Sequence, residues 1–220
     1  MNYAKLIDHT LLKQNSIQSQ FDVLCLEAKT HDFATVCVNP SWVSYCKDKL
    51  KDSSVMVCTV IGFPLGATSS QSKAFETQQA LSEGADEFDM VINIGALKDH
   101  RDAYVLEDIK AVVKAASGKT VKVIIETCLL NEEEKVRATE LVVQSGAHFV
   151  KTSTGFSTSG ATLEDVQLLS KVAAGRIKVK AAGGVRSSDD LKAFVEAGAQ
   201  RIGTSSGVSL IQGLDAQSSY

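Results

Sequence analysis

Three ionisable side chains stand inside apolar segments of strand length, where a charge has no easy route to water. They are Asp89, Lys151 and Lys180, and each lies toward the C-terminal half of its segment. In a barrel of parallel strands the active site is built at that end of the strands, so we expect the three to meet in one cavity. A plainer interpretation is that the lysines reach the rim and that Asp89 is an interior salt-bridge partner. Lys122 and Lys178 lie earlier in their segments, and we interpret them as structural lysines.

Two lysines that share a cavity predict amine chemistry. A neighbouring ammonium and partial burial both disfavour protonation, so that one amine is free near neutral pH. A neutral amine attacks a carbonyl, and the imine that follows withdraws electrons, so a carbon–carbon bond beside it can break or form. A carboxyl group such as that of Asp89 would move protons during addition and dehydration. Together these residues predict an aldolase type of reaction.

Two segments that follow predicted strands indicate an anion site. Gly183 and Gly184 lie between a predicted strand and a predicted helix, and glycine lets backbone N–H groups approach an anion. Serine hydroxyls follow the last predicted strand, where the phosphate sites of barrels are frequent. Taken singly, each segment is also explained as an ordinary turn. The predicted phosphate-binding residues are Gly155, Gly183, Gly184, Ser205 and Ser206.

No metal site is predicted, because the four histidines do not pair at ligand spacing and the sequence has no Cys/His cluster. Cys37 and Cys58 are expected to be small core residues, with the alternative that Cys37, near a strand end, faces the cavity. Asp8 is expected either to orient a cavity lysine or to pair structurally. Thr152, directly after Lys151, is expected to contact the catalytic residues and not the substrate.

The scaffold that positions these side chains alternates two kinds of segment. Apolar, β-branched segments of strand length alternate with amphipathic segments of helix length, which is typical of βα units around a parallel sheet. Strands are predicted at residues 6–8, 34–38, 56–61, 87–92, 121–126, 149–152, 178–181 and 201–204, and helices at 19–30, 41–50, 70–83, 102–116, 132–144, 163–172 and 189–196. Helix starts are indicated by Asn131 with Glu134, by Thr162 with Asp165, and by Ser188.

Eight such units in 220 residues fit a single-domain (βα)8 TIM barrel of the α/β class. The dipeptide Gly-Ala recurs after three helical segments, and the segments 149–155 and 201–207 resemble each other, which supports repeated units. We expect the barrel to occupy residues 1–213 and a flexible tail to occupy residues 214–220. A doubly wound open sheet would give a similar local pattern, but the sequence lacks its usual glycine-rich fingerprints.

Charge and composition exclude several classes of protein. The 23 basic and 26 acidic residues give a net charge of −3, without the basic surplus that nucleic-acid binding needs. The most apolar stretch, residues 55–65, is too short to span a membrane. Five cysteines without a C-x-x-C pair, and an N-terminal segment unlike a signal peptide, predict a reduced, cytoplasmic protein.

Six segments carry a specific resemblance to a known family. They are Ile7-Asp8-His9-Thr10-Leu11-Leu12, Val36-Cys37-Val38-Asn39-Pro40, Val60-Ile61-Gly62-Phe63-Pro64-Leu65-Gly66, Glu87-Phe88-Asp89-Met90-Val91-Ile92-Asn93, Phe149-Val150-Lys151-Thr152-Ser153-Thr154-Gly155 and Val179-Lys180-Ala181-Ala182-Gly183-Gly184-Val185-Arg186. The chain resembles the deoxyribose-phosphate aldolases, a class I aldolase family, along essentially its full length. The resemblance implies a (βα)8 barrel that reversibly cleaves 2-deoxy-D-ribose 5-phosphate to acetaldehyde and D-glyceraldehyde 3-phosphate. It also implies that no metal or organic cofactor is used, and it favours a homodimer.

Matched to this sequence, the resemblance implies that Lys151 forms the Schiff base, Lys180 lowers its pKa and Asp89 transfers protons. It places the family's phosphate loops on the same five glycines and serines that the loop composition predicts. Some members also use a C-terminal tyrosine on a mobile tail, and this tyrosine would be Tyr220. One departure is Phe156, where some relatives have a lysine, so one possible phosphate contact is missing.

Two other functions stay open at this stage. A barrel isomerase or synthase would bind a sugar phosphate and use Asp89 as an enolising base. Lys151 would then be an electrostatic clamp, and no covalent adduct would form. A catalytically silent sensor on the same barrel would bind a sugar phosphate without turnover.

Overall fold

Residues 2–214, the part of the chain that this computed structural model describes, contain eight parallel strands that close into a barrel. The strands are β1 (Ile7–Leu11), β2 (Thr35–Val38), β3 (Met56–Ile61), β4 (Glu87–Val91), β5 (Thr120–Ile124), β6 (Phe149–Lys151), β7 (Lys178–Ala182) and β8 (Arg201–Thr204). Each strand pairs with its neighbours in chain order, and β8 pairs with β1. The predicted TIM barrel is therefore confirmed, and the open sheet is excluded. Of the predicted tail 214–220, only Leu214 lies among the described residues.

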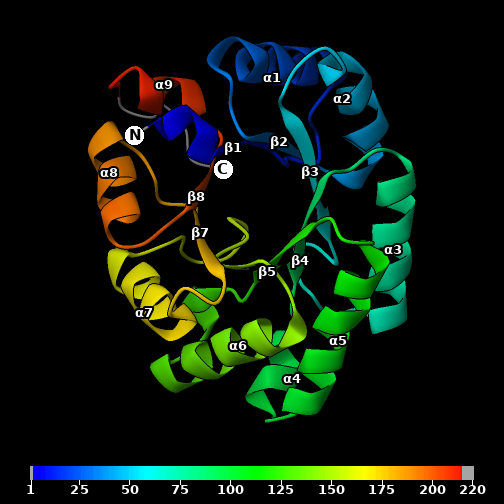
Figure 1. Cartoon of the computed structure of the whole chain (residues 1–220), viewed down its shortest axis with the longest axis vertical. Coiled ribbons are helices and arrows are strands. Elements are labelled where there is room, and N and C mark those ends of the chain that lie inside the picture. The colour runs from blue at the N-terminus through cyan, green and yellow to red at the C-terminus, as the bar shows by residue number, and fades with distance from the viewer. Residues whose placement is uncertain (1, 215–220) are drawn as a thin grey trace.

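Helices surround the barrel, as the view in Figure 1 shows. They are α1 (Gln18–His31), α2 (Val43–Leu50), α3 (Ser70–Ser82), α4 (Ile94–Lys98), α5 (Asp102–Ala115), α6 (Glu132–Ser145), α7 (Leu163–Ala173), α8 (Ser188–Glu196) and α9 (Gly207–Ile211), with 3-10 helices at Tyr3–Leu6, Pro40–Trp42 and Thr127–Leu129. Sequence periodicity missed α4 and α9, because five residues are too few to show a helical period. Within residues 2–214, no helix is long and apolar enough to cross a membrane.

Side-chain caps fix where several helices begin. Asn131 accepts a hydrogen bond from the Glu134 N–H at 2.9 Å, and the Glu134 carboxylate accepts one from the Asn131 N–H, which is the predicted capping box. Thr162 caps α7 as predicted. The predicted cap Ser188 is wrong by one residue. Ser187 is the cap of α8, because its backbone is extended and its side chain accepts from the first turn.

Strand register places charged side chains next to each other. In the parallel ladder, Asp89 of β4 is paired with Lys122 of β5, and Lys151 of β6 is paired with Lys180 of β7. Successive side chains of a strand point to opposite faces. Asp89 contacts lysines from three other strands, so it faces the barrel interior and Phe88 faces the helix layer.

The helix layer contains a buried ion pair of its own. Lys73 of α3 donates a hydrogen bond to Asp108 of α5 at 2.5 Å and another to the Val91 carbonyl of β4 at 2.9 Å. Neither charged side chain has any exposed area. Burial lowers the pKa of Lys73, and the Asp108 carboxylate opposes this effect. The pair therefore ties two neighbouring helices to one strand outside the barrel interior.

Candidate active site

Asp89 lies at the centre of a cluster of buried charges in the barrel interior. Its Oδ2 accepts hydrogen bonds from Lys151 Nζ at 2.7 Å and from Lys180 Nζ at 2.6 Å. Its Oδ1 accepts one from Lys122 Nζ at 2.8 Å. The four side chains come from the adjacent strands β4 to β7. The structure thus brings together the three residues that the sequence predicts to share a cavity, and it adds a third lysine.

Asp8 of β1 supplies a second carboxylate to this cluster. Its Oδ2 accepts a hydrogen bond from Lys180 Nζ at 2.5 Å. Its Oδ1 accepts from Arg201 at 2.7 Å and from the Thr35 hydroxyl at 2.8 Å. Of the two arrangements expected from the sequence, Asp8 therefore shows both, because it orients a cavity lysine and also pairs with Arg201.

The charges of Asp89 and Lys180 are fixed by these contacts. Burial alone would raise the pKa of Asp89, but Lys122, Lys151 and Lys180 outweigh it and hold that pKa well below its usual range. Burial alone would lower the pKa of Lys180, but the carboxylates of Asp8 and Asp89 raise it above its usual range. At neutral pH Asp89 is therefore ionised and Lys180 is cationic.

Lys151 differs from the other two lysines in its partners and its exposure. Among the described residues, Lys151 Nζ pairs with the carboxylate of Asp89 alone, whereas Lys180 pairs with two carboxylates and Lys122 with three. The Lys151 side chain retains 4% of its exposed area, and the other two retain none. Lys151 is thus the least stabilised cation of the three and the one closest to solvent.

Lys122, interpreted from the sequence as a structural lysine, is paired with carboxylates, and its ammonium lies within the cluster. A part for Lys122 in the reaction is a prediction. Lys122 is the direct ladder partner of Asp89, so the register of β4 and β5 brings its ammonium to the carboxylate. The signal was present in the sequence as a charge within an apolar strand. Lys178, by contrast, is exposed and lies over the Phe149 ring, as a structural lysine would.

The predicted phosphate glycines lie in loops at the C-terminal end of the barrel. Gly155, Gly183 and Gly184 have left-handed backbone, with φ of 85°, 72° and 81°. A Cβ added at Gly160 would lie 2.5 Å from the carbonyl carbon of Gly183, so the loops after β6 and β7 are in direct contact. The structure brings these glycines to one face of the barrel, and their contact with a phosphate stays a prediction.

The predicted phosphate serines lie between β8 and α9, at the same face. Ser205 lines a cavity of about 460 Å³ together with His9 and Lys13. The backbone N–H of Ser206 donates to the Thr204 hydroxyl at 3.0 Å, which shapes the turn into α9. Lys13 is a further cation in this region that the sequence analysis did not single out.

Two side chains position the loop that follows Lys151. The Thr152 hydroxyl accepts a hydrogen bond from the Ala182 N–H at 3.1 Å and so joins β6 to β7. The buried carboxylate of Glu126 accepts bonds from the N–H and the hydroxyl of Thr154, at 3.2 and 2.5 Å. Glu126 has a positive φ of 54°, and this conformation has no signature in the sequence pattern. Sequence reasoning therefore missed Glu126.

Phe156 meets Phe63 edge to face, with ring centroids 5.2 Å apart. Both rings line a cavity of about 370 Å³ together with Leu12 and Trp42. An aromatic ring therefore lies at position 156, where the resemblance leads one to expect a lysine, and Lys13 lines the same cavity. Tyr220 lies outside the described residues, and its catalytic role stays a prediction.

Comparisons with known proteins identify related chains. A family model described as DeoC/LacD family aldolase matches residues 3–215. A protein of Streptococcus uberis named deoxyribose-phosphate aldolase is 59% identical over 220 residues, which are 100% of both chains. The deoxyribose-phosphate aldolase 2 of Staphylococcus aureus is 60% identical over the same length, again 100% of both chains.

A solved structure shares the fold. The deoxyribose phosphate aldolase from Aeropyrum pernix, whose structure is described as a unique tetramer, matches with a TM-score of 0.90 and 33% identity. This match covers 96% of the present chain and 89% of the other. The relatives, the family match and the barrel agree with one another, and the chain belongs to the DeoC/LacD family of aldolases.

Proposed function

We propose that this protein is a class I aldolase that reversibly cleaves 2-deoxy-D-ribose 5-phosphate to acetaldehyde and D-glyceraldehyde 3-phosphate. The observation that carries the proposal is the position of Lys151, which pairs with one carboxylate and lies beside the cationic Lys180. The names of the relatives that match the full length support the choice of substrate.

Lys151 is the proposed nucleophile because the cluster has an excess of positive charge. It contains four cationic groups, on three lysines and Arg201, against the three carboxylates of Asp8, Glu87 and Asp89. One cation can therefore lose its proton without leaving a carboxylate unpaired. Lys151 has the fewest partners and the most exposure, so it is the group that becomes a neutral amine and attacks the sugar aldehyde.

Asp89 is the proposed proton carrier during imine formation. While three ammonium groups surround its carboxylate, its pKa is too low for it to hold a proton. Loss of the Lys151 proton removes one cation from Oδ2 and so raises the pKa of Asp89. Attack of the neutral amine on the aldehyde gives an ammonium alkoxide, which becomes a carbinolamine when the nitrogen proton moves to the alkoxide oxygen. Asp89, protonated from solvent, then gives its proton to the departing hydroxyl, which leaves as water while the nitrogen lone pair forms the C=N bond of the iminium.

The carbon–carbon bond breaks from the iminium. A base, Asp89 or a water bound to it, removes the proton of the C3 hydroxyl, and the electrons of the C2–C3 bond move into the iminium to give an enamine. D-glyceraldehyde 3-phosphate leaves. Protonation of the enamine at its terminal carbon, for which Tyr220 is the proposed aid, and hydrolysis then release acetaldehyde and free Lys151. Lys180 remains cationic throughout.

The proposed reaction uses no metal and no organic cofactor, because the iminium itself accepts the electrons. The phosphate is proposed to bind the loops that contain Gly155, Gly183, Gly184, Ser205 and Ser206. Left-handed glycines at the ends of β6 and β7 support this placement, since they allow backbone N–H groups to approach an anion.

We also propose a cytoplasmic homodimer that binds small molecules and neither nucleic acid nor membranes. All five cysteines are free thiols, which supports a reducing compartment. The dimer rests on the family resemblance, and sedimentation at several protein concentrations tests it.

Turnover of 2-deoxy-D-ribose 5-phosphate by enzyme treated with a chelator tests the proposed function. The expected result is equimolar acetaldehyde and D-glyceraldehyde 3-phosphate, each detected by a coupled dehydrogenase. An isomeric sugar phosphate without acetaldehyde would support the isomerase instead. Saturable binding without any product would support the sensor.

A further inference from the structure

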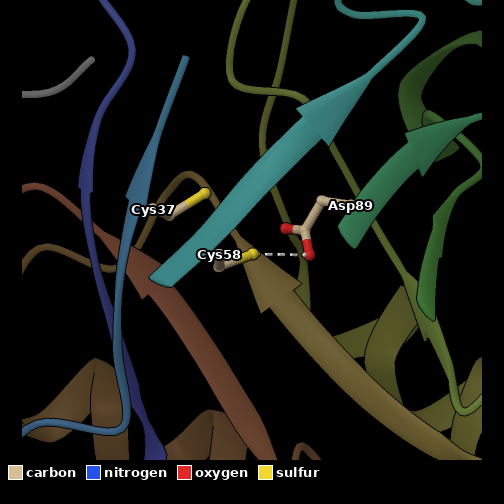
Figure 2. Close-up of side chains that lie close together, drawn as sticks. All are labelled: Cys37, Cys58 and Asp89. Atoms are coloured by element: carbon tan, nitrogen blue, oxygen red, sulfur yellow. Dashed lines mark hydrogen bonds between the residues drawn. The ribbon is translucent and has the colours of Figure 1, made fainter. Parts of the chain in front are cut away.

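Two buried thiols lie next to the Asp89 carboxylate in the barrel interior. Cys37 of β2 and Cys58 of β3 are paired in the parallel ladder, and both side chains point toward Asp89, as Figure 2 shows. The Cys58 thiol donates to Asp89 Oδ1 at 3.2 Å. The two sulfur atoms and a carboxylate oxygen of Asp89 all lie within 4.8 Å of one another. The aldolase mechanism uses neither thiol.

We propose that Cys37, Cys58 and Asp89 form an inhibitory binding site for a thiophilic dication of the Zn²⁺ or Cd²⁺ type. Zinc bonds to thiolate sulfur are about 2.3 Å long, so the ligand atoms of a tetrahedral site lie roughly 3.5 to 3.8 Å apart. The three atoms here lie within 4.8 Å of one another, so the side chains must close by up to about 1 Å to bind the metal. A fourth position remains for water, as in zinc sites with three protein ligands.

Charge balance favours this site despite the neighbouring lysines. Each thiol loses one proton when it binds the metal, so a dication replaces two protons and the net charge of the cluster does not change. Lys122 Nζ lies 3.3 Å from the Cys58 sulfur and favours its thiolate, whereas burial and the neighbouring Cys37 thiol raise the pKa of Cys58. The metal competes with Lys122 for Asp89 Oδ1, but Lys122 keeps its contact with Glu87 at 2.6 Å.

Another possible ligand group within residues 2–214 is less suitable. Asp8, Cys58 and Glu87 also lie within mutual reach, but this group has a single thiol. The pair of thiols therefore selects the first group, because soft thiolate ligands bind zinc and cadmium preferentially.

Inhibition follows from the position of Asp89. A metal held by its carboxylate would withdraw the proton carrier from Lys151, so turnover would stop while the fold is kept. Cys37, Cys58 and Asp89 have no exposed area, so a cation can enter only when neighbouring side chains move, and binding should be slow. The inhibitory effect rests on the proposed function, whereas binding of the metal does not.

The test is a titration of the reduced protein with Cd²⁺, in a Cys128→Ser background that removes the most accessible thiol. The readouts are the ultraviolet cadmium–thiolate absorption, the bound metal per chain and, separately, turnover. We expect one bound Cd²⁺, slow loss of turnover, and recovery with a chelator. The Cys37→Ala/Cys58→Ala variant should lose the absorption, and Cys37→Ser should weaken binding at least about tenfold.

Cys25 and Cys46 provide a matched control, because they are also buried and also interact with each other through their thiols. The Cys25→Ala/Cys46→Ala variant should bind Cd²⁺ like the parent protein. Three results would each overturn the site: no absorption in the parent protein, absorption that persists in the variant without Cys37 and Cys58, or absorption lost in the control variant.

Binding without inhibition would overturn the role of Asp89 as a ligand. Metal binding to a protein that shows no aldolase turnover would instead reject the proposed function and leave the site intact. Circular dichroism checks folding, and Cys37→Ser alone decides the matter if the double variant does not fold.

Discussion

The ammonium of Lys122 lies 2.8 Å from Oδ1 of Asp89, whereas Lys151 and Lys180 both contact Oδ2. Lys122 thus holds the carboxylate from one side and leaves the other oxygen facing the proposed nucleophile. Because Lys122 has no exposed area, we expect any effect of Lys122 on the reaction to pass through Asp89.

We therefore expect Lys122→Met to lower kcat at least about tenfold, since a positioned proton-transfer group contributes about 100-fold or more to a rate. KM should change less. Loss of a cation should raise the pKa of Asp89 and move the acidic limb of the pH–rate profile to higher pH. Lys178→Met, at an exposed lysine of β7, is the control. Wild-type kcat and an unshifted profile for Lys122→Met would show that the contact does not matter.

The second prediction concerns the charge of Lys180. Replacing it by leucine removes a positive neighbour from Lys151 and leaves Asp8 and Asp89 with one cation fewer. Both changes make the neutral amine on which the proposed reaction depends harder to form, so we expect the acidic limb of the pH profile of kcat/KM to move to higher pH. Activity near neutrality should fall, and Lys180→Arg should retain more of it. A profile identical to that of the wild type would reject the role of Lys180.

The third prediction concerns the phosphate loops. Ser206→Asp places a negative charge at the start of α9, where the substrate phosphate is proposed to bind. The KM for 2-deoxy-D-ribose 5-phosphate should rise at least about tenfold, which corresponds to about 1.4 kcal/mol, and the KM for 2-deoxy-D-ribose should not. Gln212→Asp adds the same charge at an exposed position farther along. Equal effects on the two sugars would place the phosphate elsewhere.

The fourth prediction concerns stability. Lys73→Met leaves Asp108 buried without its cation, so we expect a loss of about 3–5 kcal/mol in the free energy of unfolding. Lys73→Met/Asp108→Leu should recover most of this loss, because both charges are then absent. Lys110→Met, which breaks an exposed pair with Glu107, should cost less than about 1 kcal/mol. Urea unfolding measures the stability of all three variants. A Lys73→Met protein as stable as the wild type would contradict the argument.

The barrel was predictable because its two signals, apolar segments of strand length and amphipathic segments of helix length, are both local. Strand-length apolar segments mark each strand, and the ends of 56–61 and 201–204 agree with β3 and β8 without correction. Short helices such as α4 and α9 were not predictable, because one turn has no period. The one-residue error at Ser187 has a similar cause, since adjacent serines fit the capping pattern equally well in sequence.

The central residues of the site were predictable because a charge within an apolar strand is rare and costly. The contact between Lys122 and Asp89 was not predictable, because it depends on the register between β4 and β5. Nor was Glu126, whose contact with Thr154 depends on a left-handed backbone. The relation between Cys37, Cys58 and Asp89 likewise arises only when three strands lie side by side.

The most direct test of the account is reduction of the protein with borohydride in the presence of acetaldehyde, followed by intact mass and peptide mapping. The account predicts one added ethyl group, on Lys151. That result would exclude the enolising isomerase and the sensor together. Folded protein without an adduct would contradict the aldolase mechanism, and an adduct on Lys180 would contradict the assignment of the two lysines.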